Sequence, residues 1–144
     1  MSFKFTVSTV LPASPRVVYD TWLDSRGHGA MTGTKAKATT KVGGKWSATD
    51  AYCWGENLEL VPGRKIVQSW RSADFEDGDA DSKISVTLKP APGGTKLILL
   101  HSAIPDSQKD GGYKEGWVDY YFDPMQAYFT KLAAKKPARK VKKK

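Results

Sequence analysis

The sequence predicts an α+β fold in which a curved antiparallel sheet of about seven strands wraps around a long C-terminal helix. Two observations lead to this class. Apolar side chains recur every three or four residues over 111–134, as they do on one face of a helix. From Thr34 to residue 103 the apolar period is instead two, interrupted by turns rich in glycine and proline. A strongly twisted sheet of this size curls into a trough, and the terminal helix is large enough to fill it.

The terminal stretch 111–134 carries a wide apolar stripe. One row of side chains is predicted to lie along a single side of the helix: Tyr113, Trp117, Tyr121, Met125, Tyr128 and Leu132. Pro124 lacks a backbone donor and its ring crowds the carbonyl of Tyr120, so we predict a kink within one continuous helix. The helix is predicted to end near Lys135 and Lys136, whose charges suit the negative end of the helix dipole.

The N-terminal segment alternates apolar and polar side chains over 3–11, which predicts a half-buried strand. Ser14 followed by Pro15 is typical of an N-cap and a first helical position, so a short helix is predicted to end near Asp24. Residues 25–33 contain three glycines and are predicted to form a second, loosely helical connection.

The remaining strands are predicted from two-residue periodicity and from the turns between them. They are expected at 34–41, 45–53, 55–61, 64–73, 82–90 and 95–103. The turns are expected at Gly43-Gly44, Pro62-Gly63, Asp77-Gly78-Asp79 and Pro92-Gly93-Gly94.

The charge of the chain is concentrated at its end. The net charge is +8, but 135–144 holds seven basic groups and no acid, which leaves 16 basic against 15 acidic groups elsewhere. We therefore predict one folded domain, 1–134, and a disordered basic tail. Its basic residues are Lys135, Lys136, Arg139, Lys140, Lys142, Lys143 and Lys144. Such a tail either raises solubility or contacts nucleic acid or an anionic membrane nonspecifically. Composition favours the first role, because no aromatic side chain is interleaved for base stacking.

The composition also limits the classes of function. The N-terminus has no signal-peptide core and no apolar run could span a bilayer, so a soluble, cytoplasmic protein is expected. Cys53 is the only cysteine, which excludes an intrachain disulfide and a cysteine-rich zinc site. Two histidines cannot form a metal cage by themselves, and no phosphate-binding loop is present, so no metal and no cofactor are expected.

Several motifs in order carry a family resemblance. They are 28–33 (HGAMTG), 42–46 (VGGKW), 54–63 (WGENLELVPG), 66–71 (IVQSWR) and 116–122 (GWVDYYF). Together they resemble the family related to the C-terminal domain of activators of the ninety-kilodalton heat-shock protein ATPase. That family belongs to the START-like superfamily, also called SRPBCC, which includes the birch pollen allergen. The resemblance covers nearly everything from Phe3 to Phe129.

The resemblance implies a helix-grip fold that commonly encloses a cavity, a chaperone as a partner, and a role in the stress response. The activators proper carry a separate N-terminal domain that makes much of the chaperone contact, and 144 residues leave no room for it. Around Ala51, Tyr52 and Cys53 the family pattern leads us to expect a glycine and a β-branched residue where alanine and cysteine stand. This difference is expected to alter the strand edge or the cavity wall. The basic tail is also outside the family pattern.

Aromatic side chains supply the candidate cavity lining. The predicted set is Trp54, Trp70, His101, Tyr113, Trp117 and Tyr121. These side chains either fill the space between helix and sheet or line a site for an apolar ligand. His101 is either a cavity acid or base, acting with Asp106 or Tyr113, or a strand-end histidine bonded to the backbone. His28 either gates a cavity entrance or caps its turn.

Three functions follow, in order of preference. The first is a binding domain that holds a small hydrophobic ligand between helix and sheet, without catalysis. The second is a co-chaperone-like module that docks on a chaperone. The third is an enzyme that uses polar groups inside the cavity.

Overall fold

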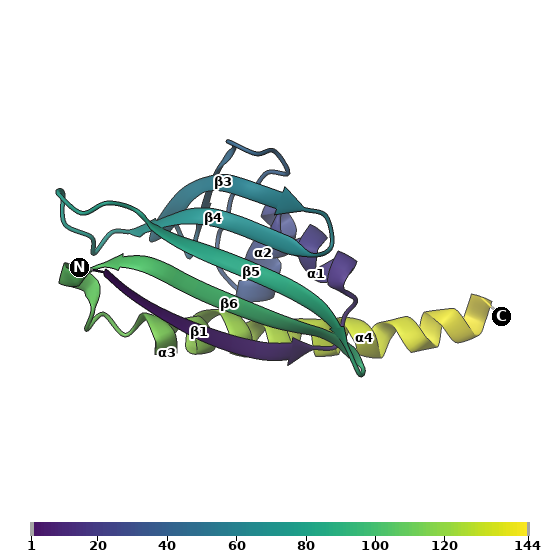
Figure 1. Cartoon of the computed structure of the whole chain (residues 1–144). Coiled ribbons are helices and arrows are strands. Elements are labelled where there is room, and N and C mark those ends of the chain that lie inside the picture. The colour runs from purple at the N-terminus through teal and green to yellow at the C-terminus, as the bar shows by residue number, and fades with distance from the viewer. Residues whose placement is uncertain (1, 144) are drawn as a thin grey trace.

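The computed structural model describes the backbone of residues 2–143 and the side chains of residues 3–134. A six-stranded sheet curves over a long helical segment, and two short helices close one end of the trough (Figure 1). The strands are β1 (Ser2–Leu11), β2 (Lys45–Ala48), β3 (Cys53–Val61), β4 (Lys65–Ser72), β5 (Ser82–Ala91) and β6 (Gly94–Pro105). The helices are α1 (Pro15–Trp22), α2 (Ser25–Thr32), η1 (Asp106–Gln108), α3 (Tyr113–Trp117), the π-helical η2 (Val118–Phe122) and α4 (Asp123–Lys143).

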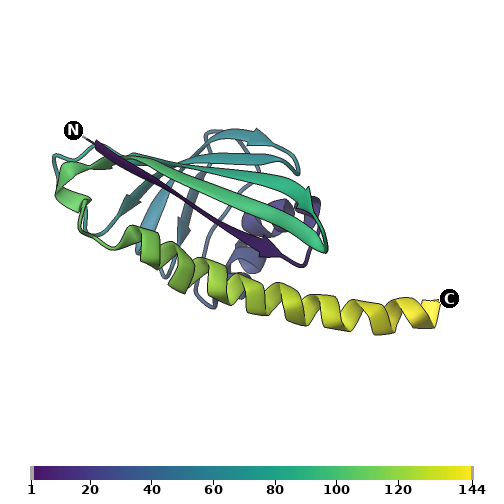
Figure 2. The same cartoon turned by 60° about the horizontal axis from the view of Figure 1, so that its bottom comes forward.

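The sheet is antiparallel throughout, in the order β1-β6-β5-β4-β3-β2. Strands β2 to β6 therefore form a meander, and β1 joins it beside the last strand. Turned by 60°, the molecule shows the terminal helix running along the trough of the sheet (Figure 2). The α+β class and the helix-in-sheet arrangement predicted from periodicity are confirmed.

The two N-terminal helices begin where their caps predict. The Ser14 side chain accepts a hydrogen bond from the Val17 N–H with Pro15 at the first helical position, and Asp24 accepts from Gly27 N–H in the same way. Gly33 ends α2 in the left-handed conformation, at φ 74°. The connection predicted to be loosely helical is thus a short, capped helix.

The predicted strand at 34–41 is wrong, and the sheet has six strands instead of about seven. This segment makes a single β-bridge, Lys37 to Ser47. Side chains satisfy much of its remaining backbone: Ser25 Oγ pairs with both backbone groups of Ala38, and the Asn57 amide donates to the carbonyls of Thr39 and Lys41. The TKAKATTK sequence alternates as a strand does, but it has no large apolar side chain to bury.

The boundary between the second and third predicted strands is also corrected. Instead of 45–53 and 55–61, β2 ends at Ala48 and β3 begins at Cys53. Residues Thr49, Asp50 and Ala51 have positive φ angles of 55°, 58° and 72°, so the chain reverses there. Three successive left-handed residues cannot continue a strand.

The irregularity predicted at Pro124 is a π-helical turn just before it. The Asp123 N–H bonds to the Val118 carbonyl, five residues back, at the end of η2. Pro124 follows directly after this turn, where the hydrogen-bond pattern changes from five-residue to four-residue spacing, and a proline without a backbone donor is tolerated at such an irregularity. Helix α4 is assigned to Lys143, beyond the end predicted near Lys136. The side chains of 135–144 lie outside the described part, so the division into domain and tail stays a prediction.

The core lies between the trough and the helical segment. Its largest fully buried side chains come from every layer: Trp22 of α1, Ile84 of β5, Leu99 of β6, and Met125 and Phe129 of α4. The predicted stripe on the terminal helix is therefore the buried face. The exposed Glu115 and Asp119 lie on its other side.

Candidate ligand pocket

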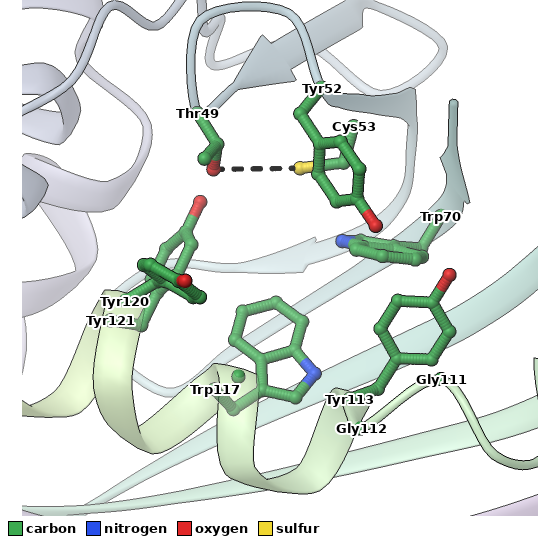
Figure 3. Close-up of a pocket in the computed structure, with 11 residues that line it drawn as sticks. Thr49, Tyr52, Cys53, Trp70, Gly111, Gly112, Tyr113, Trp117, Tyr120 and Tyr121 are labelled. Atoms are coloured by element: carbon green, nitrogen blue, oxygen red, sulfur yellow. Dashed lines mark hydrogen bonds between the residues drawn. The ribbon is translucent and has the colours of Figure 1, made fainter. Parts of the chain in front are cut away.

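A pocket of about 470 Å³ opens between the β2–β3 turn and the beginning of the terminal helical segment (Figure 3). Strand β4 contributes one wall through Trp70. The lining residues are Thr49, Tyr52, Cys53, Trp70, Gly111, Gly112, Tyr113, Gly116, Trp117, Tyr120 and Tyr121. Tyr120 is 66% exposed and lies at the mouth, while Trp70, Trp117 and Tyr121 are buried. Aromatic rings supply most of the wall, which is the usual surface of a site for an apolar molecule.

The β2–β3 turn that forms the upper wall in Figure 3 is strained. Thr49, Asp50 and Ala51 all occupy the left-handed region, which disfavours side chains with a Cβ. The Lys35 N–H donates to the Asp50 carboxylate at 2.9 Å, and the Thr49 hydroxyl lies 3.9 Å from the Cys53 sulfur. Such strain persists only where surrounding contacts hold it.

Replacing Ala51 by glycine is therefore expected to raise the free energy of unfolding by about 1 kcal/mol, because glycine adopts this conformation without steric cost. Chemical denaturation measures the change. Ala127→Gly is the matched control: Ala127 lies exposed within α4, so the same substitution is expected to destabilise by about 1 kcal/mol. Destabilisation of similar size at both positions would contradict the strained turn.

Trp70 presents an unpaired donor to the pocket. Its side chain is 4% exposed, and its Nε1 is the buried side-chain nitrogen without a hydrogen-bond partner among the residues that the structure describes. In Figure 3 this nitrogen points into the space between the β2–β3 turn and the helix. A buried donor left unpaired is costly. The pocket therefore contains one polar group that a ligand could satisfy.

The hydroxyls of Tyr113 and Tyr52 at the pocket already have partners. The Tyr113 hydroxyl donates to Gln108 Oε1 at 2.7 Å and meets Ser72 Oγ at 2.9 Å, and the Tyr52 hydroxyl donates to Asp74 at 2.5 Å. Burial raises the pKa of Tyr52, of Tyr113 and of the Cys53 thiol, the last to about 12. These groups are uncharged near neutral pH.

Tyr121 connects the pocket to a buried polar chain. His28 Nδ1 donates to the Trp22 carbonyl at 2.8 Å, so its Nε2 accepts from the Tyr121 hydroxyl at 2.6 Å. The Trp22 indole donates to Gln68, which donates to Asn57. His28 is 3% exposed and lies in the core, so it does not gate an entrance; its ring instead bonds the backbone carbonyl of Trp22 at the end of α1. Burial lowers the pKa of His28 to about 4.

His101 lies behind the pocket wall instead of lining it. The Trp117 indole donates to His101 Nδ1 at 3.1 Å, so Nε2 carries the proton and donates to Ser82 Oγ at 2.8 Å. The Ser82 hydroxyl in turn donates to the Trp70 carbonyl at 2.7 Å. Burial lowers the pKa of His101 to about 3. Both ring nitrogens are occupied, so this histidine has no free nitrogen with which to serve the exposed Asp106 or Tyr113 as a catalytic partner.

The family model for "Activator of Hsp90 ATPase homolog 1-like protein" matches residues 12–130. The chain belongs to this family. Human activator of 90 kDa heat shock protein ATPase homolog 1 is 28% identical over 126 residues, which are 88% of this chain and 37% of the human protein. The homologue from Dictyostelium discoideum is 28% identical over 121 residues, 81% of this chain and 30% of that protein. The chain thus spans about a third of the length of these relatives.

Solved structures extend the likeness to the fold. An HSP90 activator from Plasmodium falciparum has a TM-score of 0.73 and 28% identity, covering 88% of this chain and 94% of that one. A protein from Mesorhizobium loti has a TM-score of 0.76 at 21% identity, covering 90% and 98% of the two chains, and supports the fold alone.

Four of the six side chains predicted for the cavity of this family member line the pocket: Trp70, Tyr113, Trp117 and Tyr121. The other two lie elsewhere. His101 is behind the wall, and Trp54 is 39% exposed on β3. Periodicity alone did not identify the β2–β3 turn as a wall. One sequence signal could have identified this turn. The family pattern leads us to expect a glycine near Ala51, and glycine is typical of left-handed backbone, which is the conformation found at Ala51.

Two further searches concern metal-ligating groups and membrane-spanning helices in the described part of the chain. It contains no group of three or more His, Cys, Asp or Glu side chains placed to hold a metal ion. None of its helices combines the length and the apolar character needed to cross a bilayer.

Proposed function

We propose that this domain binds a small, largely apolar molecule in the pocket between the β2–β3 turn and the helical segment α3–η2, as a binding protein and not as an enzyme. The observation that carries the proposal is an aromatic pocket of about 470 Å³ with an unpaired buried donor in its wall. Small-molecule sites have volumes of roughly 300–1,000 Å³ and combine apolar walls with few polar groups.

The pocket is open to solvent at one side, so a ligand has a path of entry. Tyr120 and the exposed glycines Gly111 and Gly112 form this side. Trp117 and Tyr121 form the inner wall, with ring centroids 4.8 Å apart. A flat molecule placed against these rings removes apolar surface from water, at about 25 cal/mol per Å².

Filling the pocket from the protein side tests the proposal. A side chain at Gly116 would meet only Tyr120, at 3.9 Å, within 4 Å of its Cβ, so Gly116→Phe fills the pocket without removing core atoms. Isopropylnaphthalene and a medium-chain fatty alcohol serve as neutral apolar probes. We expect them to shift the indole N–H signals of Trp70 and Trp117 in NMR spectra of the wild type. The substitution is expected to weaken binding at least tenfold.

Gly78→Phe is the matched control, since Gly78 is exposed in the β4–β5 loop and its Cβ would meet nothing within 4 Å. This variant should bind both probes as the wild type does. If neither probe shifts Trp70 or Trp117, or if Gly116→Phe and Gly78→Phe bind alike, the pocket is not a ligand site.

A second candidate, docking on a chaperone, is favoured by the comparisons. The Plasmodium falciparum structure described as an HSP90 activator is matched over 94% of its length. Adding a purified 90-kDa chaperone to the same NMR sample separates the candidates. Broadening that begins at the exposed Trp54 and spares Trp70 would favour docking over pocket binding. A cytoplasmic location, a stress-response role and nonspecific nucleic-acid contact through 135–144 also stay proposals.

A further inference from the structure

We propose that the pocket ligand is a neutral aromatic molecule with a hydrogen-bond acceptor, such as a ketone oxygen, that pairs with Trp70 Nε1. This inference rests on the proposed function and adds the chemical class of the ligand. It follows from three properties of the pocket wall: which donor is free, how firmly that donor is held, and which charges are missing.

Trp70 differs from the other buried tryptophans. The indole N–H groups of Trp22, Trp46 and Trp117 donate to Gln68, to the Ser69 carbonyl and to His101. Each of these three donors is satisfied inside the protein, whereas Trp70 Nε1 has no partner within the described residues and points into the pocket (Figure 3). Buried donors are rarely left unpaired, and an exception calls for an explanation. An acceptor supplied by a ligand is one.

The ring of Trp70 is held from several sides, so the donor is fixed before a ligand arrives. Aromatic rings surround it at centroid distances between 4.8 and 6.1 Å: His101, Tyr113, Phe75 and Trp117. Its backbone carbonyl accepts from Ser82, which His101 also contacts. A donor held in this way loses little conformational freedom on binding, and this preorganisation favours affinity.

The enclosed tyrosine hydroxyls of the pocket are already used as donors inside the protein. The hydroxyls of Tyr52, Tyr113 and Tyr121 donate to Asp74, Gln108 and His28. The Thr49 hydroxyl faces the Cys53 sulfur. Tyr120 lies at the mouth and is 66% exposed, so water competes for its hydroxyl, whereas the Trp70 donor is buried. A ligand with a single acceptor therefore finds its best enclosed partner at Trp70.

The wall also selects against charge. No Lys, Arg, Asp or Glu is among the residues that line the pocket in the described part of the chain, and the Asp74 carboxylate accepts from the lining residue Tyr52. An ionised carboxylate would lose its hydration without meeting a cation, which is unfavourable. The aromatic walls add a preference for flat rings, which pack against Trp117 and Tyr121 in offset or edge-on contacts.

Three naphthalenes with the same number of heavy atoms, substituted at the same ring carbon, test the class of ligand. Acetylnaphthalene offers a carbonyl oxygen, isopropylnaphthalene has no acceptor, and naphthoate is an anion. We expect acetylnaphthalene to bind the full-length protein about tenfold more tightly than isopropylnaphthalene, which is a difference of about 1.4 kcal/mol in binding free energy. Naphthoate is expected to bind more weakly than either. Both neutral probes shift the Trp70 indole proton through the ring currents of the naphthalene. Only acetylnaphthalene should add a downfield shift, because only it accepts a hydrogen bond from this proton.

Trp70→Phe removes the donor and keeps an aromatic ring. The variant should bind both neutral probes with similar affinity, so the tenfold preference is lost. If it does not fold, the indole shift in the wild type decides alone. Equal affinities of the wild type for the two neutral probes would overturn the acceptor and leave pocket binding standing. Tightest binding of naphthoate would overturn the neutral class. Binding of none of the three would overturn the inference together with the proposed function.

Discussion

Replacing Trp117 by alanine is expected to lower the free energy of unfolding by about 3–5 kcal/mol through lost packing alone. Trp117 is 5% exposed and contacts the rings of Trp70, His101 and Tyr121. The substitution also removes the partner of His101 Nδ1, and a buried acceptor left unpaired adds about 1–3 kcal/mol. Since whole domains are stable by only about 5–15 kcal/mol, this is a large fraction of the total. Urea denaturation followed by circular dichroism measures it.

Trp54→Ala is the matched control, because Trp54 is 39% exposed on β3 and its indole lies outside the core cluster. Its loss should change stability much less. Trp117→Phe divides the effect: the ring remains and the donor is lost, so an intermediate loss is expected. If Trp117→Ala and Trp54→Ala lower the free energy of unfolding equally, the terminal helix is not held to the sheet by its aromatic face.

The arrangement of the fold follows from residue patterns that are local and strong. The three- and four-residue spacing from Tyr113 to Leu132 predicted the helix, because a stripe that wide must lie on a large apolar surface. The pattern also predicted strands at 34–41 and across Thr49, and both predictions failed. Periodicity reports which side chains could share a face, but not whether partner backbone groups are available. Side chains such as Asn57 take the place of the β-ladder in the first segment.

The pocket was predictable in part. Large aromatics spaced along the helix had to face the sheet, and Trp117 and Tyr121 do so at the pocket. The place of a strand residue such as His101 is harder to predict. Side chains on the same side of a strand can line the pocket or lie in the core behind it, and only the three-dimensional packing shows which. Trp70 was predicted as a lining residue, but its unpaired nitrogen was not. An unmet hydrogen bond depends on every neighbour within about 3 Å, which a sequence does not show.

Acidification is expected to destabilise the folded domain by about 5 kcal/mol between about pH 7 and about pH 4.5, through its two buried histidines. Burial lowers the pKa of His101 to about 3 and of His28 to about 4, whereas an unfolded histidine has a pKa of about 6.5. Between these values the unfolded chain binds protons that the folded one does not, so stability falls as pH falls. Each histidine contributes a slope of at most about 1.4 kcal/mol per pH unit.

Burial resists protonation of both rings, and at His101 the hydrogen-bond geometry adds to it. His101 Nδ1 accepts from the Trp117 indole, which can only donate, so a second proton on that ring would face a donor. The Tyr121 hydroxyl beside His28 Nε2 can also accept, so burial is what resists protonation of His28. The pH range over which the histidines act is separate from that of Asp79. The pKa of Asp79 lies below its ordinary value because the Ser107 hydroxyl donates to its carboxylate. The stabilisation from Asp79 is lost only at lower pH, as its carboxylate becomes protonated.

Urea denaturation at a series of pH values measures the slope, which should approach about 2.7 kcal/mol per pH unit between about pH 6 and about pH 4.5. In His101→Asn the amide oxygen can still accept from Trp117, and the slope should fall to about half. Imidazole ¹⁵N spectra test the same point without substitution: both rings should stay neutral in the folded protein at about pH 5, with the proton on Nδ1 of His28 and on Nε2 of His101. A ring that titrates near its ordinary pKa of about 6.5 in the folded state would show that it is not enclosed between Tyr121 and Trp22, or between Trp117 and Ser82.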